Sequence, residues 1–384
     1  MDDLFGRTAT MTGLGESRAI GEAERRDRLR LFRSENVGPV TWHRLLAAYG
    51  SAADALAALP ELSRRGGRRK PVKVCPKGDA DREMAALERL GARLLTAGEP
   101  DYPAPLAALE DAPPVLAVRG HPHLLARPAV ALVGARNASA AGRRLARGLA
   151  GDLAGGGLLV VSGMARGIDG AVHEGALDGG TAAVLAGGPD VVYPPDNENL
   201  YHRMVEGGAV LSEMPPGAEP QARHFPRRNR IIAGLALGTV VVEATGRSGS
   251  LITARLAAEN GREVMGVPGS PADPRSHGPN NLIRQGATLV ENADDVRRAL
   301  APLLDKPLGE APDDTLPAPR PDLPEDALAA ARDAIRDALG PAPVHVDELL
   351  RLCDVPAPLG ATVLLELELA GVVARHPGNQ VALA

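Results

Sequence analysis

Residues 129–139 read Ala129-Val-Ala-Leu-Val133-Gly134-Ala-Arg136-Asn-Ala-Ser139, an apolar run that leads through a glycine turn into a helical pattern at 140–153. An apolar run of this length, closed by a turn, is typical of a strand buried on both faces of a parallel sheet. The same rhythm recurs downstream, with apolar runs at 158–161, 181–185, 209–211, 239–243 and 263–267 and helical patterns at 170–177 and 250–260. The alternation predicts an α/β protein whose core, at 86–300, is a Rossmann-like, mostly parallel sheet.

Segments of different composition flank this core. Residues 1–24 are polar and predict a flexible tail. The helical pattern at 25–85, with a Gly38-Pro39 turn ahead of an amphipathic helix, predicts a small SAM-like or helix-hairpin-helix-like domain. Seven prolines at 301–324 predict a semi-rigid linker. Residues 325–384 show three helical patterns followed by a β-hairpin, which together predict a winged-helix domain.

Composition limits where the chain works and what it binds. Of 384 residues, 24% are charged and 2% are aromatic, and the formal net charge is −5. A nucleic-acid site on such a chain has to be a local basic patch with few aromatic platforms. The sequence shows no signal-peptide pattern and no apolar stretch that could span a bilayer, so we expect a cytoplasmic protein without membrane insertion. Cys75 and Cys353 form no ligand cluster, so we expect no metal.

Three loops rich in glycine and hydroxyl side chains follow three of the expected strands, at 134–139, 162–169 and 243–250. The carboxyl ends of parallel strands lie at one edge of a sheet, so we expect these loops to meet there. Glycine lets the backbone approach an anion, helix N–H groups hold the anion and arginine adds a charged contact. The dinucleotide fingerprint and the Walker lysine are both missing, so no cofactor is expected. The candidate phosphate-binding residues are Gly134, Arg136, Ser162, Gly163, Arg166, Gly167, Ser248, Gly249, Ser250 and Thr253.

Asp169 and His173 follow the second loop at a spacing of four residues, which puts them on one face of a helix. They form either an acid–base pair, or a structural pair in which the aspartate caps the helix and the histidine packs against a partner. The structural interpretation is favoured because no nucleophile is placed beside them.

A basic segment with an aromatic ring inside it is Arg223-His-Phe-Pro-Arg227-Arg228-Asn229-Arg230, which holds four arginines and one aromatic ring in eight residues. Such a patch suits a nucleic-acid backbone and a stacked base. We therefore add Arg227, Arg228, Asn229 and Arg230 to the candidate site.

The order of these motifs resembles a known family. Gly134-Ala-Arg136, Ser162-Gly-Met-Ala-Arg-Gly-Ile-Asp169, Phe225-Pro-Arg-Arg-Asn-Arg-Ile-Ile-Ala-Gly234 and Ser248-Gly-Ser-Leu-Ile-Thr-Ala254 follow one another as in the DNA-processing protein A (DprA/Smf) family. The resemblance implies a single-stranded-DNA-binding protein, not an enzyme, that protects incoming DNA in natural transformation and loads the RecA recombinase onto it. It also implies a homodimer formed through the core. Finally, it adds Gly188, in the loop Gly187–Asp190, as part of a wall against bases.

Two other functions remain open. The core is also similar to phosphoribohydrolases, in which a glycine-rich loop is followed by a catalytic glutamate, but Ala254 stands at that place here. Alternatively, the chain acts mainly as an adaptor through protein–protein contacts. The C-terminal domain bears on this question, because its third helical pattern, at 358–370, contains Glu366 and Glu368 but no Lys or Arg. We therefore expect that helix not to read DNA in the usual way of winged helices.

Overall fold

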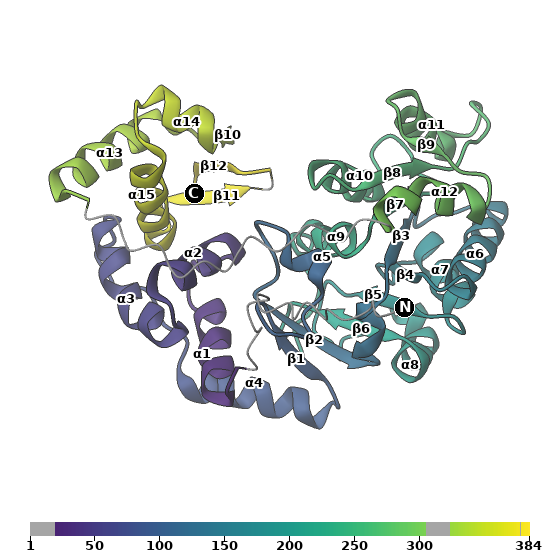
Figure 1. The fold of residues 1–384 in the computed structure, drawn as a ribbon, viewed down its shortest axis with the longest axis horizontal. Coiled ribbons are helices and arrows are strands. Elements are labelled where there is room, and N and C mark those ends of the chain that lie inside the picture. The colour runs from purple at the N-terminus through teal and green to yellow at the C-terminus, as the bar shows by residue number, and fades with distance from the viewer. Residues whose placement is uncertain (1–19, 305–322, 377) are drawn as a thin grey trace, which may run out of the picture.

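The computed structural model describes residues 20–304, 323–376 and 378–384, and Figure 1 shows how their elements are arranged. At the centre is a nine-stranded sheet in the order β1-β2-β6-β5-β4-β3-β7-β8-β9. The seven strands from β6 through β3 to β9 run parallel to one another. Strands β1 and β2 add an antiparallel edge beside β6. The strands are Arg93–Thr96 (β1), Val115–Gly120 (β2), Ala129–Val133 (β3), Leu159–Ser162 (β4), Thr181–Val184 (β5), Ala209–Ser212 (β6), Gly238–Val241 (β7), Glu263–Gly266 (β8) and Thr288–Leu289 (β9). The predicted mostly parallel α/β core is confirmed.

Helices cover both faces of the sheet, which explains why its strands are apolar throughout. In β3, Val130 and Leu132 pack toward one face, and Ala131 and Val133 pack toward the other. Successive side chains of a strand point to opposite faces, so a strand covered on both sides needs an unbroken apolar run. The first face carries α6 (Ala140–Gly155), α7 (Ile168–Ala176), α8 (Glu198–Gly207) and α12 (Ala293–Leu304), and the second carries α5 (Ala104–Ala107), α9 (His224–Leu235), α10 (Gly249–Glu259) and α11 (His277–Arg284).

The strand order reverses at β3, which lies between β4 and β7. The chain passes from β3 to β4 on one side and later returns to β7 on the other. In open α/β sheets, ligands bind beyond the carboxyl ends of the strands at such a reversal. The loops that follow β3, β4 and β7 are the three glycine-rich loops of the sequence.

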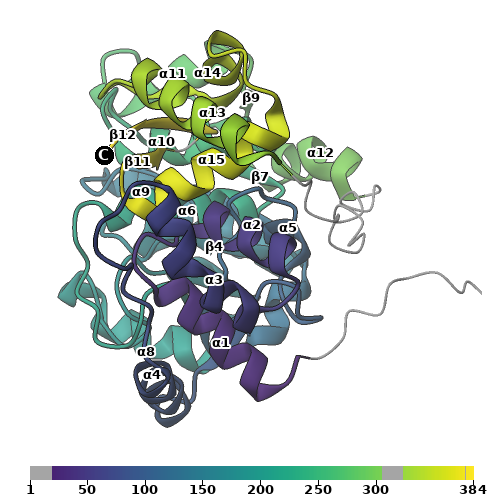
Figure 2. The same cartoon turned by 90° about the vertical axis from the view of Figure 1, so that its left-hand side faces the viewer.

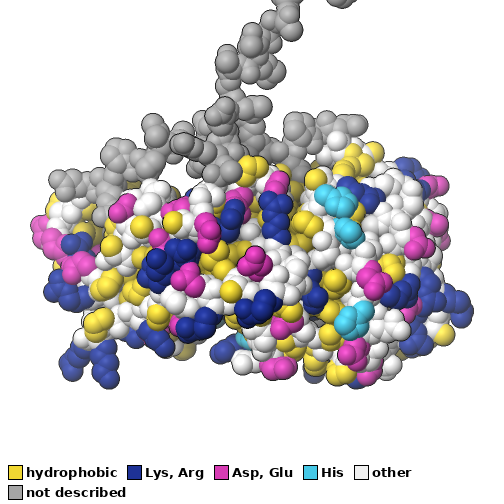
Figure 3. Space-filling view, turned by 90° about the horizontal axis from the view of Figure 1, so that it is seen from below, with side chains coloured by type: hydrophobic (Ala, Val, Ile, Leu, Met, Phe, Trp, Pro, Cys, Tyr) yellow, Lys and Arg dark blue, Asp and Glu magenta, His cyan; other side chains and the backbone are white. Residues whose placement is uncertain are grey.

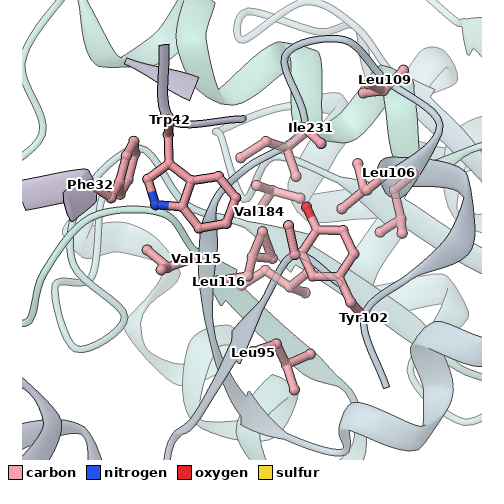
Figure 4. Close-up of a cluster of buried hydrophobic side chains, with 14 of the residues drawn as sticks. Phe32, Trp42, Leu95, Tyr102, Leu106, Leu109, Val115, Leu116, Val184 and Ile231 are labelled. Atoms are coloured by element: carbon pink, nitrogen blue, oxygen red, sulfur yellow. The ribbon is translucent and has the colours of Figure 1, made fainter. Parts of the chain in front are cut away.

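Four helices form the N-terminal domain: α1 (Glu22–Arg33), α2 (Pro39–Tyr49), α3 (Ala52–Arg65) and α4 (Lys77–Arg89). Gly50 ends α2 in the left-handed conformation (φ 76°), and Ser51 begins α3 by accepting a hydrogen bond from the N–H of Asp54. Figure 4 shows Trp42 of α2 in one buried cluster with Tyr102 and Val115, so this domain shares its core with the sheet.

Two expected boundaries are wrong by a few residues. Helix α1 begins at Glu22, inside the expected tail at 1–24, because the acidic residues of its first turn suit the positive end of a helix. Residues 1–19 of that tail lie outside the described residues. Helix α12 continues to Leu304, past the expected start of the linker at 301, because Leu300 and Leu303 pack on α6 on either side of Pro302. The rest of that expected linker, at 305–322, also lies outside the described residues.

The C-terminal domain is a winged helix, as predicted. It contains α13 (Glu325–Ala338), β10 (Val344–His345), α14 (Val346–Leu352), α15 (Ala357–Ala370), β11 (Val373–His376) and β12 (Gln380–Leu383). Its strands pair in the order β10-β12-β11, and its helices enclose a core of their own. Figures 1 and 2 show this domain beside the N-terminal domain, with α15 against α3.

Candidate nucleic-acid interface

Two adjoining hollows lie at the carboxyl edge of the sheet, where the three glycine-rich loops meet. The inner pocket has a volume of about 120 Å³, and the outer groove has a volume of about 710 Å³. Arg136, Ala165, Phe225 and Arg228 line both hollows and so join them. The structure therefore brings together the loop after β3, the loop after β4 and the basic segment at 223–230.

The inner pocket is built for a flat ring. Leu185, Val191 and Pro194 make part of its apolar wall. The rings of Tyr193 and Phe225 stand at its mouth, with centroids 5.7 Å apart and planes tilted by 60°. Tyr193 is 45% exposed, an unusual position for a large aromatic ring. The guanidinium of Arg136 lies 5.0 Å from the centroid of Phe225. Aromatic faces and a neighbouring cation are the groups that hold an unstacked base.

The outer groove contains the N-terminus of α10. Gly249 and Ser250 begin this helix, and no side chain caps it at Ser248. Instead, the hydroxyls of Ser248 and Ser250 hydrogen-bond to each other at 2.8 Å. Unpaired N–H groups and the helix dipole make such an end attractive to anions. Asn229 and Thr253 line the same groove, so the groove offers a phosphate several donors.

Arg228 is a buried cation between the two hollows, and only 7% of it is exposed. Its Nη1 donates to the carbonyl of Val184 at 2.7 Å, and its Nε has no hydrogen-bond partner in the described part of the chain. Burial lowers the pKa of this guanidinium to about 10, and the charge of Asp169 opposes that effect. Arg228 is therefore charged at neutral pH and keeps donor capacity for an anion.

Asp169 and His173 are structural residues here. The Asp169 carboxylate accepts hydrogen bonds from the N–H groups of Gly163 (3.2 Å) and Ala165 (3.4 Å), so it fixes the loop after β4 and does not cap α7. Burial raises its pKa, against the charge of Arg228. His173 is buried, and its Nδ1 lies 2.8 Å from Oγ1 of Thr181. Burial lowers the pKa of His173 to about 3. The arrangement suits a rigid support under the pocket.

The first loop differs from expectation in one respect. The N-terminus of α6, which follows this loop, already holds a carboxylate of the chain. Glu243, in the loop that follows β7, accepts from the backbone N–H of Ser139 at 2.9 Å and from its hydroxyl at 2.6 Å. An anion already occupies that helix end, so the N-terminus of α6 is closed to a ligand, whereas the N-terminus of α10 lines the outer groove.

Three of the expected glycine and serine residues have structural roles instead of lining a hollow. Ser162 is buried, and its hydroxyl donates to the carbonyl of Leu132 at 2.7 Å. Gly167 has a φ of 81° and lies against the backbone of Arg136, where a side chain would not fit. Gly188 is buried in its loop, and its neighbour Gly187 lines the inner pocket.

The arginines of the basic segment separate in space because they lie on a helix. Arg228 faces the hollows, whereas Arg227 is exposed outside them. Arg230 lies away from the hollows, in a buried ion pair with Glu213. We therefore remove Arg230 from the candidate site. Arg166 lines the inner pocket and pairs with Asp196 at 2.8 Å on the exposed rim.

Other lining residues were not assigned from the sequence. Phe225 is the ring of the basic segment, and Tyr193 with Pro194 belongs to the ordered motifs of the family resemblance, but neither residue was named as a site residue. Asn137 and Arg275 also line the outer groove, although Asp273 holds Arg275. An exposed aromatic ring in a chain with 2% aromatic residues was the available signal for Tyr193.

The remaining surface and fold show two further facts. Within residues 20–304, 323–376 and 378–384, no group of His, Cys, Asp and Glu could hold a metal ion, and no helix is long and apolar enough to cross a membrane. Basic and acidic side chains lie next to each other on the face shown in Figure 3, in keeping with ion pairs such as Arg26–Asp81. That face therefore shows no continuous basic stripe.

These features define a multidomain α/β protein with a groove for anions and flat rings at the switch point of a Rossmann-like sheet. Family models match three consecutive parts of the chain: a DprA-like N-terminal HHH domain at 22–86, DNA recombination-mediator protein A at 93–301, and a DprA winged helix domain at 318–379. The chain belongs to the DNA recombination-mediator protein A (DprA/Smf) family.

Individual relatives agree with this assignment. The chain is 39% identical to Protein Smf of Escherichia coli over 80% of its own length and 82% of the relative's. It is 41% identical to DNA processing protein DprA of Bacillus subtilis over 56% of its own length and 73% of the relative's. The X-ray structure of DprA from Streptococcus pneumoniae matches with a TM-score of 0.60 and 35% identity, covering 73% of this chain and 97% of that one. A Helicobacter pylori DprA structure, described by its single-stranded DNA binding mode, matches with a TM-score of 0.51 and 28% identity, covering 55% of this chain and 96% of that one.

Proposed function

We propose that the joined inner pocket and outer groove bind single-stranded DNA. Arg228 carries this proposal. It is a buried cation with an unpartnered Nε, and it lies between a pocket for a ring and a helix end open to an anion. A nucleotide offers those two groups, a base and a phosphate, side by side. Membership of the family and the Helicobacter pylori relative support the same ligand.

The shape of the inner pocket favours a single strand over a duplex. A base can reach the rings of Tyr193 and Phe225 only when it is unstacked and unpaired, and opening a duplex costs a few kcal/mol. The walls are apolar and the donors of the groove suit phosphate, so the site reads the backbone and a ring face. We therefore expect little sequence preference.

The finer function rests on the family. We infer that the protein acts in the cytoplasm, protects incoming single strands during natural transformation and loads the RecA recombinase onto them, as a homodimer formed through its core. Sedimentation at micromolar concentration tests the dimer, and a sedimenting monomer with and without DNA would contradict it. Recombinase loading is tested by RecA filament formation on strands already coated with a single-strand-binding protein.

A hydrolytic function fits this site less well. Asp169 and Asp273 are the acidic residues that line the outer groove. The first is bound to two backbone N–H groups, and the second is held by Arg275. A phosphoribohydrolase needs a carboxylate that is free to act on its substrate. Incubation with nucleotide mixtures tests this alternative, and release of free base would support it.

The binding proposal is tested by anisotropy titrations with a labelled oligo-dT strand and with a duplex of the same length. We expect the single strand to bind at least about tenfold more tightly, a free-energy difference of about 1.4 kcal/mol. Equal affinities would show that the inner pocket does not take a base. Two variants that each remove one positive charge serve as a comparison: Arg228→Met lies within the site, and Arg255→Ala lies on the exposed side of α10. Binding through the groove predicts that single-strand affinity falls in the first variant and not in the second.

A further inference from the structure

The third helix of the winged helix, α15, is covered by the N-terminal domain. Thr41 of α2 donates its hydroxyl to Oε2 of Glu368 at 2.6 Å, and the amide of Asn36 donates to the carbonyl of Leu369 at 3.1 Å. Figures 1 and 2 show α15 next to α2 and α3. Winged helices usually place this helix in the major groove of DNA. Here the helix is used for a contact within the chain.

The two sides of this contact differ in charge. On α15, Glu366 and Glu368 are buried, and their carboxylates bind Arg332 (2.6 Å) and Arg375 (2.9 Å) of the same domain. On the N-terminal domain, Arg44 and Arg65 lie within the electrostatic reach of these carboxylates. The chain continues from Arg65 into a basic segment whose cations are Arg68, Arg69, Lys70 and Lys73. An acidic helix therefore lies at one border of a surface rich in cations, of which Arg44, Arg65 and Arg68 also have acidic neighbours in Glu110, Glu61 and Glu35.

The contact is incompletely satisfied. Oε1 of Glu366, Nη1 of Arg44 and Nε of Arg332 are buried without a hydrogen-bond partner among the described residues. Buried polar atoms in permanent contacts are nearly all paired, and an unpaired buried charge is costly. The apolar part of the contact centres on Leu365 and Leu369 of α15. The winged helix, by contrast, has a core of its own and keeps it when α15 leaves the N-terminal domain.

We propose that the winged-helix domain is a removable cover, and that the surface of the N-terminal domain beneath α15 binds the phosphate backbone of DNA once the cover opens. Glu366 and Glu368 then act as internal competitors of phosphate. The winged helix itself does not supply this binding. Its last 28 residues, at 357–384, contain one Lys or Arg, Arg375, and Glu368 and Asn379 hold that side chain.

Gly66, at the end of α3, offers a way to open the cover without changing any cation of the N-terminal domain. A Cβ atom at Gly66 would overlap the backbone of Glu366 and the side chain of Ala370, both in α15. The φ of Gly66 is −65°, so a larger residue is compatible with its own backbone. Gly66→Leu should therefore displace α15. Gly78→Leu is the matched control, because a Cβ there would meet only the mobile end of Arg82 at 3.6 Å.

The test uses the full chain and a labelled DNA duplex, which we expect the single-strand site to bind more weakly than a single strand. We expect Gly66→Leu to speed hydrogen exchange in α15 and to raise duplex affinity by about fivefold or more, the scale of typical coupling between sites. Adding Arg44→Ala and Arg65→Ala should remove the gain. Gly78→Leu should match the unchanged protein, and oligo-dT affinity should stay within about twofold in all variants.

Two results would overturn this proposal. One is faster exchange in α15 with unchanged duplex affinity, which would mean that the uncovered surface binds no DNA. The other is unchanged exchange in α15, which would mean that the contact accommodates a leucine and is not a close cover. Both readings are independent of the single-strand site, because oligo-dT binding reports separately on Arg228.

Discussion

Gly163 and Arg228 require each other, because a Cβ atom on the glycine would overlap Nη1 of the arginine. The glycine directly follows β4 and lines the inner pocket, and the arginine comes from α9, on the second face of the sheet. The missing side chain leaves the space in which a guanidinium can lie buried beneath both hollows. Glycine in the motif Ser162-Gly-Met-Ala-Arg166 therefore acts through a distant arginine.

Replacement of Gly163 by alanine should displace Arg228 and weaken DNA binding. We expect Gly163→Ala to lower oligo-dT affinity by about tenfold or more, since a buried charge-assisted contact contributes about 1.5–3 kcal/mol. Anisotropy titration measures this loss. Gly148→Ala on α6 is the matched control, because nothing lies within 4 Å of a Cβ there. Full affinity in Gly163→Ala would show that Arg228 does not contact the strand.

The aromatic rings at the inner pocket should each contribute to binding. We expect Phe225→Ala and Tyr193→Ala to weaken oligo-dT binding by about 1–3 kcal/mol each, the usual loss for a stacking platform. Phe225→Leu keeps the apolar volume but removes the ring, and it should lose nearly as much as Phe225→Ala. If the Phe225→Leu variant and the unchanged protein have the same oligo-dT affinity, stacking on this ring is ruled out.

Arg136 should contribute a phosphate contact that salt can reveal. Removing one phosphate contact to a single strand lowers the slope of log affinity against log salt by about 0.7. We expect this change for Arg136→Ala, measured by titration at several salt concentrations. Arg255→Ala serves as control, because Arg255 is exposed on α10 and pairs with Glu259 at 3.5 Å. Identical slopes in the Arg136→Ala variant and the unchanged protein would place Arg136 outside the DNA path.

Arg230 should matter for stability and not for DNA. Its side chain and that of Glu213 are each 8% exposed in their ion pair. Removing one partner of a buried pair costs about 3–5 kcal/mol because the other charge is left unpaired. We expect Glu213→Gln to lower the free energy of unfolding by this amount in denaturant titrations, with unchanged oligo-dT affinity of the folded protein. Lost affinity at full stability would return Arg230 to the DNA interface.

His173 should make the protein sensitive to acid. Its pKa falls from 6.5 to about 3 on burial, so between these values the unfolded chain binds a proton that the folded protein does not. As the pH is lowered through this window, the free energy of unfolding should therefore decrease by about 1.4 kcal/mol per pH unit. His173→Leu should remove this part of the slope, and the exposed His202→Gln should not. A His173→Leu variant with the same acid slope as the unchanged protein would contradict the assignment.

The sequence could predict the sheet because both of its faces are buried, which leaves the continuous apolar run of Ala129–Val133 as a clear signal. It could also predict that the loops converge, because parallel strands align their carboxyl ends. It could not show that Glu243 occupies the N-terminus of α6, since Ser139 and Glu243 are 104 residues apart. That contact depends on which strands are neighbours.

The basic segment shows a limit of a different kind. Arg227, Arg228 and Arg230 look equivalent as a run, but successive helical residues are rotated by about 100°. Arg228 and Arg230 therefore point to different sides of α9, one toward the hollows and one toward Glu213. Helical geometry alone shows that these arginines cannot all line one groove. Which of them faces the hollows depends on how α9 packs on the sheet. Tyr193 could not be assigned to the site from the sequence, because its role depends on its contact with the ring of Phe225.

The most direct test of the single-strand site is a crystal structure of the protein with a short oligo-dT strand. We expect a phosphate between the N-terminus of α10 and the guanidinium of Arg228, with one base held at the rings of Tyr193 and Phe225. A strand bound on another face, with the inner pocket and the outer groove free of DNA, would contradict it.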